Sequence, residues 1–217
     1  TSTQVWEGLT PIFADINPNS LNLDPDNIEP LITEKTSAIV PVHVYGNPCE
    51  VEQIQKIADK YNLKVIYDAA HAFGVKYKEQ SVLNYGDIST LSFHATKLFH
   101  TIEGGAVVTN NDELARKIRL LINFGISGPE KVESVGTNAK MNEFQAAMGL
   151  CVLDDMNVIL KKRKYLHDTY VKKLKGSLKM PQWNSQGSAN YGYFPVLFES
   201  EEKLLAAQQR LNENEIY

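Results

Sequence analysis

The stretch SAIVPVHVYGNPCEVEQIQKIADKYNLKVIYD, residues 37–68, decides the fold. Residues 37–46 form a β-branched run that ends at Gly46, which is typical of a buried strand. Residues 49–62 place apolar side chains at helical spacing, and residues 63–68 form a second apolar run. A strand, a helix and a strand in this order predict two parallel strands joined by a right-handed crossover.

Further elements are predicted on both sides of this unit. A helix with Asp24 as its cap and Pro25 in its first turn should follow a loop that begins at residue 17. The first part of a long helix should be buried, and its basic second part should be solvated. The other patterns predict strands over 10–16, 86–94, 104–110 and 191–198, and helices over 112–125, 142–174 and 201–213.

Composition narrows the class of protein. The chain has 217 residues, of which 43% are hydrophobic and 22% charged, as in ordinary globular proteins. A net charge of −4 gives no indication of a nucleic-acid or membrane partner, and no apolar run is long enough to span a bilayer. Cys49 and Cys151 form no metal or redox motif, so we expect no metal site and a reducing cytoplasm. Neither end resembles a natural terminus, and we expect a longer parent chain.

Polar residues follow three of the predicted strands. They are the run His43–Gly46, the pair Asp68 and His71, and the run Ser92–Lys97. Ligands of open parallel sheets bind beyond the carboxyl ends of the strands. If these strands are parallel neighbours, the three groups converge on one rim.

A lysine and an aspartate on such a rim suggest a specific chemistry. Partial burial of Lys97 would make its amine nucleophilic towards carbonyl compounds, and pyridoxal phosphate is the carbonyl cofactor that uses such a lysine. The cofactor also needs an acidic partner for its pyridine nitrogen, which Asp68 could be, and hydroxyl donors for its phosphate, such as Ser92. The residues alone leave an alternative open, in which Lys97 is an exposed loop lysine and Asp68 caps a helix. Gly104–Gly105 and Asn138 can likewise be ordinary turn residues.

The order of three longer motifs resembles the DegT/DnrJ/EryC1/StrS family of pyridoxal-phosphate-dependent nucleotide-sugar aminotransferases. The motifs are PVHVYGNPCEVEQIQKIADKYNLKVIYDAAHAFGVKY (41–77), GDISTLSFHATKLFHTIEGGAVVTN (86–110) and GTNAKMNEFQAAMGL (136–150). The resemblance implies an α/β fold of type I, with a mostly parallel sheet flanked by helices. It implies a large cofactor-binding domain over 1–155, without its N-terminal part, and the start of a small C-terminal domain over 156–217.

The resemblance also implies roles for five residues. Lys97 matches the catalytic lysine that holds the cofactor covalently, and Asp68 matches the partner of the pyridine nitrogen. His71 matches a residue beside the ring near its 3′ oxygen, Ser92 a phosphate ligand, and Asn138 a residue that reaches the phosphate of the neighbouring subunit's cofactor. The implied protein is a homodimer with shared sites, and the implied reaction transfers an amino group from glutamate to a nucleotide-linked keto sugar.

The family often has glutamine at the position of His71. The motif with histidine at this position is most similar to that of the subgroup that acts on dTDP-4-keto-6-deoxyglucose-type sugars. Such products enter amino-sugar biosynthesis, including that of lipopolysaccharide O-antigens. One alternative is a sugar dehydratase on the same fold, but those relatives carry histidine in place of the lysine found here as Lys97. Another is a regulatory, non-catalytic relative that binds the cofactor or a partner subunit. Members of the family also have an earlier segment, with a turn that cradles the phosphate and an aromatic residue that stacks on the ring, and a later segment that helps to close the small domain. The sequence from Thr1 to Tyr217 resembles the part of the family between these two segments.

Overall fold

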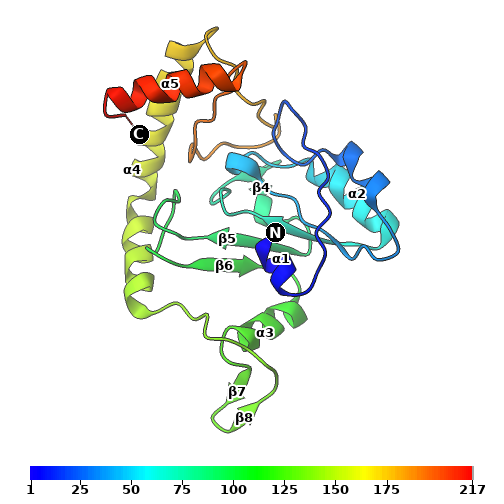
Figure 1. Ribbon diagram of the computed structural model, residues 1–217. Helices are drawn as coiled ribbons and strands as arrows, with labels where there is room; N and C mark the ends of the chain where they lie inside the picture. Colours follow the sequence, from blue (N-terminus) through cyan, green and yellow to red (C-terminus); the bar gives the residue numbers. More distant parts are fainter. Residues whose placement is uncertain (217) are drawn as a thin grey trace.

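A computed structural model describes residues 1–216, and Figure 1 shows how their elements are arranged. The centre is a four-stranded sheet in the order β1-β2-β5-β6. The strands are β1 (Ala38–Ile39), β2 (Lys64–Asp68), β5 (Ile88–Ser92) and β6 (Gly105–Val108). Strands β1, β2 and β5 are parallel, and β6 is antiparallel to β5. The predicted parallel pair is therefore confirmed.

Helix α2 (Val51–Tyr61) connects β1 to β2, as the sequence predicted. Its buried residues Val51, Ile54, Ile57 and Ala58 recur at helical spacing and pack into the same core as Val65 and Tyr67 of β2. Each valine or isoleucine side chain among them contributes roughly 1.5–3 kcal/mol when it is buried. This core fixes β2, and β2 in turn places Asp68 at the sheet edge.

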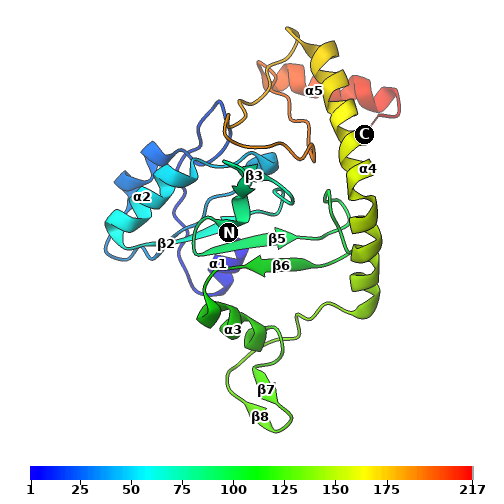
Figure 2. The same cartoon turned by 180° about the vertical axis from the view of Figure 1, so that it is seen from behind.

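The remaining elements surround the sheet (Figures 1 and 2). Helix α4 runs beside the loop between β5 and β6, whereas α3 and the β7–β8 hairpin lie at the lower end of the molecule. The helices are α1 (Ser2–Trp6), α3 (Asp112–Leu121), α4 (Glu143–Leu174) and α5 (Glu201–Glu213). The short strands are β3 (Lys76–Tyr77), β4 (Gln80–Ser81), β7 (Ile126–Gly128) and β8 (Lys131–Val132). The 3-10 helices are η1 (Pro25–Asn27), η2 (Glu29–Leu31), η3 (Val44–Gly46) and η4 (Val82–Asn84).

Side-chain caps define where the long helices begin. Asn111 accepts a hydrogen bond from the backbone N–H of Leu114 at the start of α3. Asn142 and Gln145 form a reciprocal capping box at the start of α4. Both helices begin within one residue of the starts that the sequence predicted, residues 112 and 142.

The two glycines between β5 and β6 are required by close packing. A Cβ at Gly105 would lie 2.7 Å from the carbonyl oxygen of Leu91, and Gly104 has a φ of 156° with Thr101 directly against it. These glycines are therefore more than a hairpin turn. They let β6 pair closely with β5, with Gly105 opposite Ser92, and so fix the base of the loop that carries Lys97.

Four sequence predictions are wrong, and each of the four segments contains a proline. Within residues 10–16 only Ile16 pairs with another segment, through a single β-bridge to Leu23. The segment from Pro25 forms η1 and η2 instead of an α-helix, although Asp24 caps it as predicted. The strand over 37–46 is reduced to β1 and one bridge at Val42, and residues 191–198 keep one bridge at Leu197. Each segment contains a proline, which lacks an N–H to donate: Pro11, Pro30, Pro41 and Pro195.

The first part of α4 is also exposed, contrary to prediction. Phe144 is 87% exposed, Leu150 and Leu153 also face outwards, and only Gly149 and Val152 are buried in this helix. The basic second part is exposed as predicted. The division into residues 1–155 and 156–217 falls inside this unbroken helix and stays a prediction. Within residues 1–216 no helix combines the length and apolar character needed to cross a membrane.

Candidate active site

Asp68 is the last residue of β2 and lies opposite Thr90 of β5. Its side chain is half-buried, and one carboxylate oxygen accepts a hydrogen bond from the backbone N–H of Ala70 at 3.0 Å. Within residues 1–216 this carboxylate forms no ion pair. The Ala70 N–H satisfies only one of the two carboxylate oxygens, so Asp68 can still accept a hydrogen bond from a cationic or donor group of a ligand.

His71 follows Asp68 by three residues, in the turn after β2. Its Nδ1 accepts a hydrogen bond from the backbone N–H of Tyr45 at 3.2 Å. The pKa of His71 is lowered from its ordinary value, first by burial of the ring and then by the positive charge of Lys97, while the Asp68 carboxylate acts in the opposite direction. The structure therefore brings Asp68, His71 and Lys97 into one electrostatic neighbourhood.

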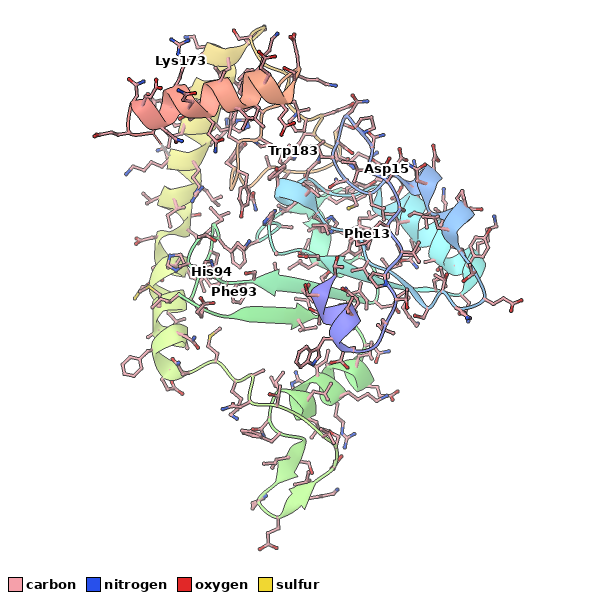
Figure 3. All side chains as sticks on the ribbon, viewed as in Figure 1. Phe13, Asp15, Phe93, His94, Lys173 and Trp183 are labelled. Atoms are coloured by element: carbon pink, nitrogen blue, oxygen red, sulfur yellow. The ribbon has the colours of Figure 1, made fainter. Side chains whose placement is uncertain are left out.

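Lys97 lies in the loop after β5. A tight turn, closed by the hydrogen bond from the Lys97 N–H to the carbonyl of His94 at 2.9 Å, sets its position. His94 Nδ1 is 2.8 Å from the hydroxyl of Thr96, and Ser92 Oγ accepts a longer hydrogen bond of 3.4 Å from the His94 N–H. Figure 3 shows Phe93 and His94 beyond the end of β5, on the side of the sheet that faces α4.

The Lys97 side chain is half-buried and forms no ion pair or hydrogen bond within residues 1–216. It also lines an open pocket of about 400 Å³ between its loop and α4. The pocket contains two further basic groups, His100 and Arg163, and one acidic group, Asp155. An amine placed in this way is accessible to a small molecule.

An aromatic cluster joins the two loops that carry these residues. Phe73 stacks on Phe99 with ring centroids 4.3 Å apart, and Phe93 packs edge-on against Phe99 at 4.8 Å. Phe73 follows His71, whereas Phe93 and Phe99 flank Lys97. The cluster therefore holds the Asp68–His71 segment against the Lys97 loop.

Asn138 lies apart from this group. It is exposed on the segment before α4, where its side-chain oxygen accepts a hydrogen bond from Lys140 at 2.9 Å and its backbone forms a bridge with Asn123. This position fits the implied contact with a neighbouring subunit better than a contact within the same chain. The role implied for Asn138 stays a prediction.

The structure adds three residues that the sequence analysis did not assign to the site. Tyr45 and Tyr193 pack against the His71 ring, with centroids 6.2 Å and 4.4 Å away, and Asn190 holds the His71 backbone. Tyr45 belongs to a strand end that was singled out in the sequence, but His43 of the same run is fully buried and accepts from Cys49 N–H. Asn190 and Tyr193 had no local signal, because only folding brings them to His71.

The residues present fit pyridoxal phosphate. The half-buried Asp68 carboxylate can accept from a protonated pyridine nitrogen, and the accessible Lys97 amine can bond covalently to an aldehyde. The Ser92 and Thr96 hydroxyls are donors of the kind that phosphate needs. Asp68 and Lys97 both have free capacity towards such a ligand within residues 1–216.

Comparison with known proteins gives the same class. An α/β sheet with an aspartate at a strand end and a lysine in the following loop is typical of type I pyridoxal-phosphate transferases. The model of the DegT/DnrJ/EryC1/StrS aminotransferase family matches residues 1–217. The chain therefore belongs to this family, whose aminotransferases depend on pyridoxal phosphate.

Three individual proteins illustrate the relationship. The dTDP-4-amino-4,6-dideoxy-D-glucose transaminase of Shigella dysenteriae is 50% identical over 201 residues, which are 91% of this chain and 54% of the relative. The crystal structure of DesI with its TDP-sugar product is 38% identical, with a TM-score of 0.88 over 96% of this chain and 55% of that one. A Streptococcus pneumoniae protein in its PMP form is 25% identical, with a TM-score of 0.92 over 98% of this chain and 61% of that one. The chain thus spans about half the length of the curated relatives it matches.

Proposed function

We propose that this protein is a pyridoxal-phosphate-dependent aminotransferase. In this proposal it moves an amino group from glutamate to a nucleotide-linked keto sugar of the dTDP-4-keto-6-deoxyglucose type. The observation that carries the proposal is the grouping of Asp68, His71 and Lys97 at the carboxyl ends of two parallel strands. The substrate class is supported by the 50% identity to a transaminase of dTDP-4-amino-4,6-dideoxy-D-glucose.

Each residue has a distinct part in the proposed reaction. When bound, the cofactor supplies an electron-withdrawing ring that stabilises negative charge at the carbon bonded to the amino group. Asp68 would accept a hydrogen bond from the ring nitrogen and so favour its protonated form. Lys97 would hold the cofactor covalently through its amine, and the same amine, when free, could take up or release a proton at the substrate carbon as a general base. His71 and Ser92 orient the ring and the phosphate.

Two other functions follow from the same fold. A sugar dehydratase is disfavoured because Lys97 occupies the position where such relatives carry histidine. A regulatory relative would bind the cofactor or a partner subunit without turnover. Mass spectrometry of a nucleotide keto sugar incubated with glutamate and the full-length protein distinguishes these functions, because only an aminotransferase produces the amino sugar.

The decisive variant is Lys97→Ala in the full-length protein. We expect loss of the visible absorbance band of covalently attached pyridoxal phosphate and a fall in turnover of at least about 10⁴-fold, because anchor and base are removed together. Lys56→Ala is the matched control, since Lys56 is an exposed lysine on α2. An unchanged absorbance band in Lys97→Ala would rule out the assignment of Lys97.

We also propose a homodimer in which a second copy covers the exposed start of α4. Phe144, Leu150 and Leu153 are exposed apolar side chains on this part of the helix, and Asn138 lies on the segment that precedes it. Burial of these side chains by a partner subunit would recover the hydrophobic free energy that the single chain forgoes.

The proposal also covers how the chain is divided into domains and where the protein is found in the cell. Residues 1–155 would belong to the large domain and residues 156–217 to the small one, which hydrogen exchange of the full-length protein can test as two protection levels. A cytoplasmic location is in keeping with the free thiols of Cys49 and Cys151, and cell fractionation tests it.

A further inference from the structure

The segment 182–193, here called the strap, follows α4 in sequence but lies against the loops of the candidate site. At its start, Asn47 donates to the carbonyl of Gln182 at 3.0 Å and accepts from the N–H of Asn184 at 2.8 Å. Further along, Ser188 exchanges two hydrogen bonds of 2.8 Å with the backbone of Lys76. The strap is therefore hydrogen-bonded to Asn47 and Lys76, which lie on either side of the Asp68–His71 segment in the sequence.

Asn190 is the central anchor of the strap. It is only 3% exposed, and its side-chain amide donates to the carbonyls of His71 at 2.9 Å and Phe73 at 3.0 Å. Its side-chain oxygen accepts from the N–H of Gly192 at 3.1 Å. All the hydrogen-bonding groups of this amide are thus directed either to the His71 loop or to the turn that leads to Tyr193.

Tyr193 completes a cluster of three rings around His71. Its ring centroid is 4.4 Å from that of His71 and 5.6 Å from that of Tyr45. Tyr45 and His71 are nearly parallel, at an interplanar angle of 12°. Since two aromatic rings cover the imidazole, water has restricted access to it, and a charged imidazolium is disfavoured there.

The backbone adds a second constraint on the same ring. The hydrogen bond from Tyr45 N–H to His71 Nδ1 requires a lone pair on Nδ1, so the ring must be neutral with its proton on Nε2. Tyr45 provides this N–H from a left-handed conformation with a φ of 57°, which is costly for a residue other than glycine. Within residues 1–216 no hydrogen bond uses Nε2, so its N–H is available to a ligand.

We propose that Tyr193, delivered by Asn190, is a positioning residue that holds His71 neutral, with Nε2–H as its only donor. This inference rests on the proposed function, in which the His71 Nε2–H would donate to the 3′ oxygen of pyridoxal phosphate. The charged groups that act on the ring are Lys97, which disfavours protonation, and Asp68, which favours it. The two tyrosine rings exclude water from the His71 ring, and this desolvation favours its neutral form.

The test is the rate at which diethylpyrocarbonate modifies His71 in the full-length apoprotein between pH 5 and pH 8, followed by peptide mass spectrometry. The reagent acylates only neutral imidazole, so the rate reports both the pKa of His71 and its coverage. The wild type should react slowly, with a midpoint below 6.5, the ordinary value for histidine. Tyr193→Ala should react several-fold faster at pH 8 and shift the midpoint upwards, while Tyr193→Phe should behave as the wild type because it keeps the ring.

Two further variants keep the test decisive. Tyr165→Ala is the matched control, because Tyr165 is 70% exposed on α4. Asn190→Leu removes the donors and the acceptor of the amide without adding a charge, releases the strap and should shift the midpoint in the same direction even if Tyr193→Ala does not fold. An unshifted midpoint in either folded variant would overturn the proposal.

Binding of pyridoxal phosphate gives the link to the cofactor. Tyr193→Ala should weaken it about tenfold, the value of one well-oriented hydrogen bond to a charged group. The modification rates require no turnover. A shifted midpoint in a protein that transfers no amino group would therefore support the positioning role while the proposed function failed.

Discussion

Gly46 offers a quantitative test of how closely the strap packs on the site. It is the last residue of η3 and has a φ of 82°, in the left-handed region that favours glycine. A Cβ added there would lie 2.7 Å from the carbonyl oxygen of His71 and 3.0 Å from the side-chain oxygen of Asn190. Neither atom can move freely, since the first belongs to backbone and the second to a buried, fully bonded amide.

Gly74 provides a matched comparison for the same substitution. Its φ of 73° is similar, but a Cβ there would meet no atom within 4 Å. Gly74→Ala should therefore destabilise the folded protein by only the conformational cost of about 1–2 kcal/mol. Gly46→Ala should be destabilised by the same conformational cost and, in addition, by about 1–3 kcal/mol from overpacking. The effect of alanine on the unfolded chain is common to both variants and cancels.

We therefore expect the free energy of unfolding of Gly46→Ala to lie about 2 kcal/mol below that of Gly74→Ala. In urea this corresponds to midpoints about 1 M apart, for a slope of about 2 kcal/mol per molar urea. Equilibrium unfolding of the full-length protein, followed by circular dichroism, measures the difference. Coincident midpoints would refute the close contact between Gly46, the His71 carbonyl and Asn190.

Two further predictions concern stability and assembly. Burial lowers the pKa of His43 to about 3, so the stability that neutral His43 provides is present above pH 6.5 and is lost as pH falls from 6.5 towards 3. Between pH 7 and pH 5.5 the wild type should lose about 1.3 kcal/mol more unfolding free energy than His43→Gln, and equal losses in urea titrations would contradict this. Phe144→Asp should convert the proposed dimer to a monomer in sedimentation velocity, whereas Lys161→Asp, on the exposed basic half of α4, should not. A dimer that persists in Phe144→Asp would exclude this surface as the interface.

Local sequence patterns determined the long, regular elements. Helix α2 and strand β2 were predictable because apolar periodicity and a buried core act together over 37–68. Caps such as Asn142 are also local, since the side chain bonds to backbone three residues away. The order Asp68, Ser92 and Lys97 indicated the chemistry because it places polar groups at the ends of consecutive strands. Short segments with a proline were predicted wrongly, since a missing N–H removes one hydrogen bond from an element that has few.

Only the tertiary structure decided what surrounds His71. The sequence placed His43 and Tyr45 together at one strand end, but folding buried His43 in the core and turned the Tyr45 N–H to His71. Tyr193 and Asn190 are more than a hundred residues away from His71 along the chain, and no local pattern connects them. Likewise, the exposure of Phe144 depends on which surfaces the rest of the fold covers. Residues can be identified as reactive from their type and order, whereas their protonation depends on charges and rings that long-range contacts bring together.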